Sequence, residues 1–115
     1  MFNISSMYPA TKGYHFDFDY YLNRHMPRSI ALLSQADGFR GVSVERGLPI
    51  NEQNMEQNME PAYIALYHYS FDTIENFMAA FMPHTEELQG DIKNYTNIEP
   101  VLQINAVEIA QGEGR

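Results

Sequence analysis

His25 is the side chain in this sequence whose type and spacing point most directly to chemistry. It lies seven residues after Phe18, and at about 100° per residue the two side chains lie about 20° apart around a helix. Pro27 follows two residues later, where its ring removes a main-chain hydrogen bond and clashes with the carbonyl of Asn23. The helix is therefore predicted to kink or restart near His25, which opens a gap beside an imidazole that can exchange a proton near neutral pH.

The surroundings of that gap are predicted to suit a small organic molecule. Phe18 and Leu22 would line it from the same helix, and tyrosines of the strands would line it from the sheet. In such a pocket His25 could act as a general base while a tyrosine hydroxyl stabilises a developing oxyanion. The alternative is that His25 is a hydrogen-bonded core residue, which a single histidine on an apolar helix face often is.

Other aromatic and histidine side chains are candidates for the same pocket. His84 lies seven residues after Phe77 in a second predicted helix, which repeats the spacing of the first. His68 alternates with apolar neighbours and is predicted to be buried in the sheet. Four tyrosines could fill the core or a dimer contact, or could instead contact a substrate: Tyr8, Tyr63, Tyr67 and Tyr95. Of these, Tyr8, Tyr67 and Tyr95 are the predicted substrate-binding residues.

Other kinds of site lack the residues that they require. The four histidines show no HxxxH or carboxylate-x-x-His spacing, so no metal site is predicted. The chain has no cysteine nucleophile, no GxSxG motif and no glycine-rich phosphate loop, and we expect no cofactor. Arg24 and Arg28 flank His25; they could meet an anionic substrate or could form a solvated helix edge.

Length and charge restrict the class of protein. A chain of 115 residues suffices for one compact domain, which we predict to span residues 1–115. Fifteen acidic and seven basic residues give a net charge of −8, which disfavours nucleic acid and anionic membrane surfaces as partners. Because no apolar run could span a bilayer, the first residues do not resemble a signal peptide and cysteine is absent, we expect a cytoplasmic protein without membrane contact.

Hydrophobic periodicity predicts the elements that position these side chains. Period-two alternation and strand-forming residues predict strands over residues 1–8, 39–47, 61–70 and 97–110, and helical spacing predicts helices over 17–37 and 72–88. Asp17 would cap the start of the first helix and Gly38 would end it. The resulting βαββαβ order predicts an α+β fold of the ferredoxin-like type, with an antiparallel four-stranded sheet and both helices on one face.

The other face of that sheet is predicted to be rich in isoleucine, valine, leucine and tyrosine. A chain this short has no further element to cover an apolar face. A second copy of the chain is therefore predicted to pack on it, sheet against sheet, and to form a homodimer.

The segment 48–60 separates the second and third predicted strands and contains EQNM twice in tandem. It is polar and poor in β-branched residues, so we predict a mobile loop. The alternative is a short helical lid, because Met55 and Met59 would lie one helical turn apart and could touch a ligand.

Two stretches of the sequence resemble a known family. FDFDYYLNRHMP fits the pattern FDxDYYLxxHxP, and DIKNYTNIEPVLQI fits DIxNYTxxxPxxQI. With Tyr8-Pro9 and PAYIALYHYSFDTIENF, they resemble the EthD family, named from bacterial ethyl tert-butyl ether degradation, over nearly the whole chain. The resemblance implies a dimeric α+β barrel and places the family's motif histidine on His25. Relatives on this scaffold include cofactor-independent monooxygenases, lactone isomerases and polyketide cyclases, so the scaffold does not choose a reaction.

Three functional hypotheses follow from the sequence. The first is a cofactor-free enzyme in which His25 is the general base for isomerisation, cyclisation, dehydration or oxidation of a small, hydrophobic, oxygenated molecule. The second is a non-catalytic module that binds an intermediate of an oxidative degradation pathway. The third is a structural dimer with a filled core.

Overall fold

The structure, a computed structural model, describes residues 1–49 and 60–112. Within these ranges the chain forms, in order, β1 (Phe2–Pro9), α1 (Phe18–Tyr20), η1 (Tyr21–His25), α2 (Met26–Leu33), β2 (Phe39–Arg46), β3 (Tyr63–Phe71), α3 (Ile74–Phe81), η2 (Met82–His84), α4 (Thr85–Gly90), η3 (Ile92–Asn94) and β4 (Val101–Ala106). Residues 50–59, which contain both EQNM copies and most of the predicted mobile loop, lie outside the described ranges.

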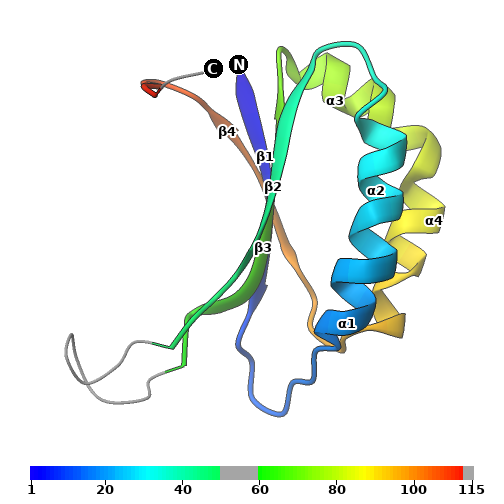
Figure 1. Ribbon diagram of the computed structural model, residues 1–115, viewed down its shortest axis with the longest axis vertical. Helices are drawn as coiled ribbons and strands as arrows, with labels where there is room; N and C mark the ends of the chain where they lie inside the picture. Colours follow the sequence, from blue (N-terminus) through cyan, green and yellow to red (C-terminus); the bar gives the residue numbers. More distant parts are fainter. Residues whose placement is uncertain (50–59, 113–115) are drawn as a thin grey trace.

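The strands form one antiparallel sheet in the order β2-β3-β1-β4. Two helical stretches, α1 to α2 and α3 to η3, lie side by side on one face of the sheet, and in Figure 1 no described helix covers the other face. This arrangement confirms the predicted ferredoxin-like α+β fold. No helix among the described residues is long and apolar enough to cross a membrane.

The two faces of the sheet differ in composition. Strand alternation turns Ile4 and Tyr8 of β1 and Tyr69 and Phe71 of β3 toward the helices, where each is at most 1% exposed. The residues on the other face, which we call the open face, are mostly polar: Asn3, Ser5, Met7, Ser43, Glu45, Leu66, His68, Ser70, Val101, Gln103 and Asn105. The predicted apolar open face is therefore wrong, because the large apolar and aromatic side chains occupy the alternate positions that face the helices.

Pro27 has the predicted effect on the first helix. Asp17 caps its start by accepting a hydrogen bond from the amide of Tyr20, but the chain then widens into the π-helical turn η1. The amide of Met26 bonds the carbonyl of Tyr21, five residues back, and α2 starts with Pro27 in its first turn, where a proline needs no amide hydrogen. The helix restarts at Met26, next to His25.

Prolines also set the ends of two other elements. The predicted helix over 72–88 is continuous only to Phe81, because Pro83 introduces the 3₁₀ turn η2 and α4 then starts afresh. Its first helix, α3, is capped by Thr73 rather than Asp72, which instead pairs with Arg40. The last strand begins only after Pro100 and ends at Ala106, so it is shorter than the predicted 97–110.

Candidate functional site

The π-helical turn η1 places the side chain of His25 on the buried side of the helices, facing the sheet. His25 is 5% exposed, and its ring is stacked parallel to that of Tyr21, at 6.1 Å between ring centroids. The ring of Tyr95 lies on it at 4.8 Å and is tilted by 51°. Both tyrosines are fully buried. Because two packed rings hold the imidazole, its orientation is fixed before any ligand arrives.

Asp91 holds one nitrogen of the imidazole. Its Oδ2 lies 2.9 Å from His25 Nδ1, while its Oδ1 accepts from Tyr20 Oη at 2.6 Å and from Asn94 Nδ2 at 2.9 Å. Burial opposes ionisation of Asp91, but the hydrogen bonds from Tyr20, Asn94 and His25 outweigh it, so its pKa lies below the ordinary value. Asp91 is therefore an ionised carboxylate at neutral pH.

The ionised partner decides the tautomer of the neutral ring. A carboxylate only accepts hydrogen bonds, so Nδ1 of His25 must carry the hydrogen and Nε2 keeps its lone pair. Within the described residues no side chain is hydrogen-bonded to Nε2. Tyr21 Oη is the only fully enclosed polar side-chain atom there without a partner, so Nε2 itself is not fully enclosed. The lone pair of Nε2 is thus unoccupied.

A cavity of about 90 Å³ lies between the helices and the sheet, and we call it the inner cavity. One part of its lining is polar and consists of His25 and the side chains of two serines and two tyrosines, Ser6, Ser29, Tyr8 and Tyr67. The rest of the lining is mainly apolar: Leu33, Phe81, Leu88, Gln89, Ile92, Pro100 and Leu102. An apolar cavity with a few convergent polar groups has the composition of a small-molecule site.

The tyrosine hydroxyls around the inner cavity stay protonated. Tyr8 Oη and Tyr95 Oη share a hydrogen bond of 2.5 Å, and Tyr69 Oη shares one of 2.8 Å with Ser29. Burial raises the pKa of Tyr8, Tyr67 and Tyr95, and it raises the pKa of Tyr69 to about 12. These groups therefore do not supply a base at neutral pH, and among them Tyr8 and Tyr67 line the cavity.

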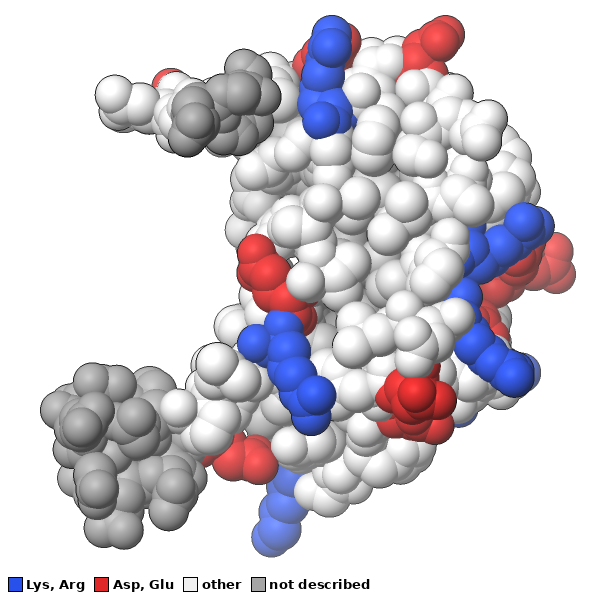
Figure 2. All heavy atoms as spheres, in the orientation of Figure 1, with Lys and Arg blue, Asp and Glu red and all other residues white. Residues whose placement is uncertain are grey.

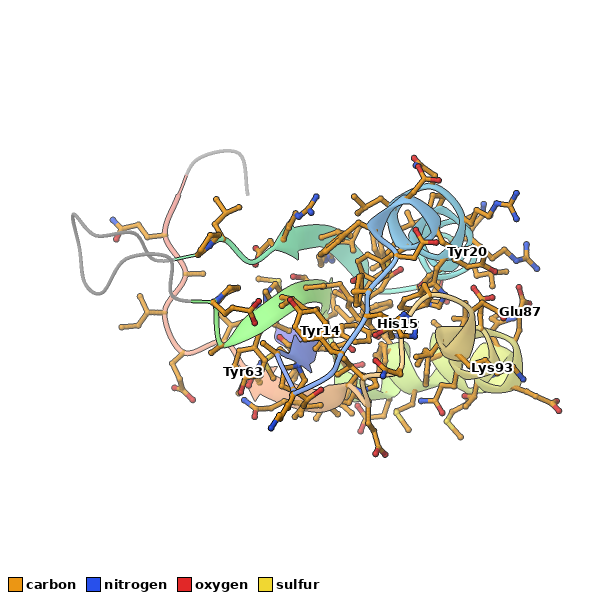
Figure 3. All side chains as sticks on the ribbon, turned by 90° about the horizontal axis from the view of Figure 1, so that it is seen from below. Tyr14, His15, Tyr20, Tyr63, Glu87 and Lys93 are labelled. Atoms are coloured by element: carbon orange, nitrogen blue, oxygen red, sulfur yellow. The ribbon has the colours of Figure 1, made fainter. Side chains whose placement is uncertain are left out.

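A second space, which we call the outer cleft, opens between the two helical stretches and measures about 480 Å³. Figure 3 shows Tyr20 on the first stretch beside Glu87 and Lys93 on the second. Its lining is strongly charged: Tyr20, Arg24, His25, Arg28, Glu86, Glu87, Leu88, Gly90, Asp91, Lys93 and Asn94. His25 and Leu88 line both the outer cleft and the inner cavity.

Comparison with known proteins identifies the family of this chain. No protein-family model matches the sequence, and no curated protein matches it. An EthD-like protein from Ralstonia eutropha JMP134, of known structure, is 39% identical, has a TM-score of 0.82 and matches over 97% of this chain and 96% of its own. This chain belongs to the EthD family. The resemblance carried by the two sequence patterns is thereby confirmed.

Two further solved structures share the fold of this EthD-family protein. An ethyl tert-butyl ether degradation (EthD) family protein from Bacillus halodurans C-125 is 17% identical, with a TM-score of 0.59 over 93% of this chain and 98% of that one. A candidate antibiotic biosynthesis monooxygenase from Bordetella bronchiseptica is 14% identical, with a TM-score of 0.57 over 94% and 96%. At these identities the likeness concerns the fold alone.

Four of the predicted site residues of the EthD-family chain come together. His25, Tyr8 and Tyr67 line the inner cavity. Tyr95 lies one layer behind, where it bonds Tyr8 and packs on the ring of His25. These residues come from η1, β1, β3 and the segment after η3, so the fold alone makes them neighbours.

The other three predicted site residues line neither space. Phe18 packs on Phe16 and lies beneath the guanidinium of Arg46, 4.0 Å from it. Leu22 is 43% exposed, because the widened π turn shifts the helical phase after Tyr21. His84 lies in the 3₁₀ turn η2, whose tighter winding moves it off the face that Phe77 buries.

Sequence reasoning missed the group that orients His25. Asp91 lies 66 residues further along the chain, and no helical or strand spacing connects the two. One signal was present, since Asp91 and Asn94 are the aspartate and asparagine of the DIxNYT pattern and both belong to the hydrogen-bond network of the site. Among the described residues no group of three or more histidine, cysteine or carboxylate side chains could hold a metal ion.

Proposed function

We propose that this EthD-family protein is a cofactor-independent enzyme in which His25 is the general base on a small, oxygenated organic molecule. The observation that carries the proposal is the state of its two nitrogens. Nδ1 donates to an ionised Asp91, and Nε2 has no hydrogen-bond partner among the described residues. A base must also reach its proton, and His25 lines a cavity that has room for a reacting group.

The neighbouring groups supply the remaining parts of an acid–base reaction. Nε2 removes a proton from a carbon next to a carbonyl, or from a hydroxyl, and the ring becomes an imidazolium. Asp91 stabilises that cation through Nδ1, as the carboxylate of a catalytic triad does. The negative charge moves to the substrate oxygen, where the protonated hydroxyl of Tyr8 or Tyr67 donates a hydrogen bond.

The same proton completes the reaction. The imidazolium returns it to another atom of the substrate, which gives an isomerisation or a cyclisation, or to a departing hydroxyl, which gives a dehydration. With dioxygen as co-reactant, the carbanion formed by proton removal could instead be oxidised. The family membership and the fold shared with a candidate antibiotic biosynthesis monooxygenase support action on a small molecule and leave these reaction classes open.

A non-catalytic binding module is the second candidate function. One observation favours it: the hydroxyls of Tyr8 and Ser29 already share hydrogen bonds with Tyr95 and Tyr69, so two donors of the inner cavity have partners within the protein. Such a protein would bind an intermediate in the same cavity without transferring a proton. Turnover separates the two functions.

We also propose that a second copy of the chain covers the open face, which gives a homodimer. The open face carries no described helix, and a broad hollow runs along it between the strands and residues Ala110 to Gly112. Figure 2 shows this side of the molecule hollowed below its C-terminal end. The polar open face would contribute hydrogen bonds rather than an apolar core to such an interface.

Deuterium exchange tests the enzymatic proposal without knowledge of the natural substrate. The protein is incubated in D₂O with simple enolisable ketones, and loss of the proton signals next to the carbonyl is followed by NMR. We expect exchange above the buffer rate that requires His25 and survives treatment with a chelator and dialysis. If the wild-type protein binds the ketones and does not accelerate exchange, the binding-module function holds instead.

A further inference from the structure

Two buried tyrosines lie directly behind the polar part of the inner cavity. Tyr95, which follows η3, and Tyr69 of β3 are not among the described residues that line the cavity. Each hydroxyl instead lies against a hydroxyl of the lining. Tyr95 Oη is 2.5 Å from Tyr8 Oη, and in the second pair Tyr69 Oη is 2.8 Å from Ser29 Oγ. The proposed reaction at His25 gives the two buried hydroxyls no role.

The surroundings of each pair decide which hydroxyl donates. A hydroxyl has one hydrogen to donate and can also accept. Among the described residues Tyr95 Oη has Tyr8 as its single hydrogen-bond partner, and Tyr69 Oη has Ser29. If Tyr8 donated, the hydrogen of Tyr95 would be buried without an acceptor, which costs stability. The same holds for the second pair, so in each pair the buried tyrosine donates and the hydroxyl of the lining accepts.

The accepting hydroxyls keep their own hydrogens for the cavity. The side chains of Tyr8 and Ser29 line the inner cavity, where Ser6, a water molecule or a substrate oxygen can accept those hydrogens. The hydrogen bond that each hydroxyl receives also makes it a stronger donor, because hydroxyls joined in a chain polarise one another. A partner within the protein thus prepares these two hydroxyls to donate to a substrate.

We propose that Tyr95 and Tyr69 are positioning residues, each of which turns the hydroxyl hydrogen of its partner into the inner cavity, toward the oxygen of a bound substrate. This inference rests on the proposed function of His25 and adds the layer that orients the oxyanion donors. Tyr95 has a second contact with the site, since its ring centroid lies 4.8 Å from that of His25. One side chain therefore holds both the base and a donor to the developing oxyanion.

Hydroxyl-proton NMR tests the direction of the first pair without any substrate. In protein labelled with ¹³C-tyrosine, a buried hydroxyl proton that exchanges slowly with water couples to the ring carbons of the residue that carries it. We expect the proton between Tyr8 and Tyr95 to couple to the ring of Tyr95 and to vanish in Tyr95→Phe. A proton that couples to the ring of Tyr8 would overturn the inference.

Kinetics of a double variant test whether Tyr95 acts through Tyr8. Tyr95→Phe keeps the ring that packs on His25 and removes the hydroxyl, so deuterium exchange into a saturating ketone should slow about tenfold with little change in KM. In a Tyr8→Phe background the same change should alter the rate by less than about twofold, because the hydroxyl that it orients is absent. A loss as large in this background as in the wild type would show that Tyr95 acts through packing, and the inference would be wrong.

The second pair provides a matched comparison. Tyr69→Phe should also lower the exchange rate, and its effect should persist in the Tyr8→Phe background and disappear in a Ser29→Ala background. Tyr14→Phe removes a hydroxyl that donates to Glu60 and does not belong to the described lining of the inner cavity, so the wild-type rate should remain. Melting temperatures of all variants check that they fold. An effect of Tyr69→Phe that persists without Ser29 would contradict the assigned pairing.

The inference and the proposed function fail in different ways. A wild type that does not exchange the ketone would reject the general base, and the NMR experiment would still decide whether Tyr95 donates to Tyr8. Exchange that requires His25 and is unchanged in Tyr95→Phe would reject the positioning role and retain the general base.

Discussion

Among the residues that the structure describes there are two histidine–carboxylate pairs, one on each face of the sheet. Under the helices, His25 is 5% exposed and bonds Asp91 through Nδ1, and Nε2 has no hydrogen-bond partner among the described residues. On the open face, the side chain of His68 is 30% exposed, and both nitrogens have partners. Its Nδ1 lies 2.6 Å from Ser5 Oγ, and its Nε2 lies 3.3 Å from Glu45 Oε1.

A neighbouring carboxylate does not by itself make a histidine a base. Both rings have such a neighbour, but proton transfer also needs a nitrogen that is unoccupied and beside a space for the substrate. His25 meets both conditions, whereas His68 joins Ser5 and Glu45 across three adjacent strands. This contrast is consistent with the proposed chemistry at His25 and with a structural role for His68, Ser5 and Glu45 on the open face.

The largest effect on the reaction rate is expected for a substitution of His25, with the same substitution of His68 as the comparison. His25→Asn keeps a polar side chain of similar shape and removes the base, so deuterium exchange or turnover should fall by roughly two to four orders of magnitude. His68→Asn should leave that rate within about twofold. Exchange rates of both variants are measured under the same conditions as the wild type, with melting temperatures as a check on folding. If His68→Asn lost as much activity as His25→Asn, the assignment of the two faces would be wrong.

Removal of a proposed oxyanion donor should have the next largest effect. Tyr67→Phe takes one hydroxyl from the inner cavity, and the rate should fall by about a hundredfold with little change in substrate affinity. Tyr63→Phe, on the same strand and 38% exposed, is the matched control and should keep the wild-type rate. Steady-state kinetics decide between a loss in kcat and a rise in KM. An effect on KM alone would assign Tyr67 to binding rather than to stabilisation of the oxyanion.

A substitution on the open face should weaken the dimer and leave the reaction at His25 unchanged. We expect the wild type to sediment as a dimer of a 13.3 kDa chain. Ser43→Glu adds a carboxylate beside Glu45, and burial of that unpaired charge should raise the dissociation constant of the dimer at least about a hundredfold. Gln35→Glu makes the same change of charge at an exposed position beyond α2. A wild type that sediments as a monomer at micromolar concentration would contradict the dimer.

The smallest expected effect concerns stability in acid. Because the folded-state pKa of Asp91 lies below its ordinary value of 3.8, its stabilisation of the fold is complete above about pH 4 and is lost as the pH falls through the lower value. Asp91→Asn should therefore be about 1–3 kcal/mol less stable than the wild type at pH 7, and this difference should shrink on acidification.

Urea unfolding of both proteins between pH 2 and pH 7 measures that difference. Asp37→Asn, at an exposed carboxylate, serves as the control and should lose little stability at any pH. A difference between wild type and Asp91→Asn that stays constant down to pH 2 would show that the carboxylate is not held in its ionised form by the network.

The fold could be predicted largely from local pattern. The period of two in the strands and the cap at Asp17 mark boundaries along the chain. The first helical stretch ends at Leu33, before the end predicted at Gly38, and Gly38, with a φ of +83°, lies instead directly before β2. The restart of the helix beside Pro27 also follows from a local cause, the missing amide hydrogen. Pro83 and Pro100 carried the same kind of signal for the interrupted second helix and the late start of β4.

Short-range spacing and two contiguous motifs encode the family and the ferredoxin-like order of elements, and they single out His25 as a candidate site residue. Three other features depend on packing between separate elements: the carboxylate that bonds the ring of His25, the tyrosines that reach the cavity, and the face of the sheet that is apolar. Asp91 and His25 are 66 residues apart, and their 2.9 Å contact forms only because the fold brings the residue before η3 to the end of η1. A periodicity assigns a residue to a face, but the partner that it meets there depends on how separate elements pack, which no local spacing specifies.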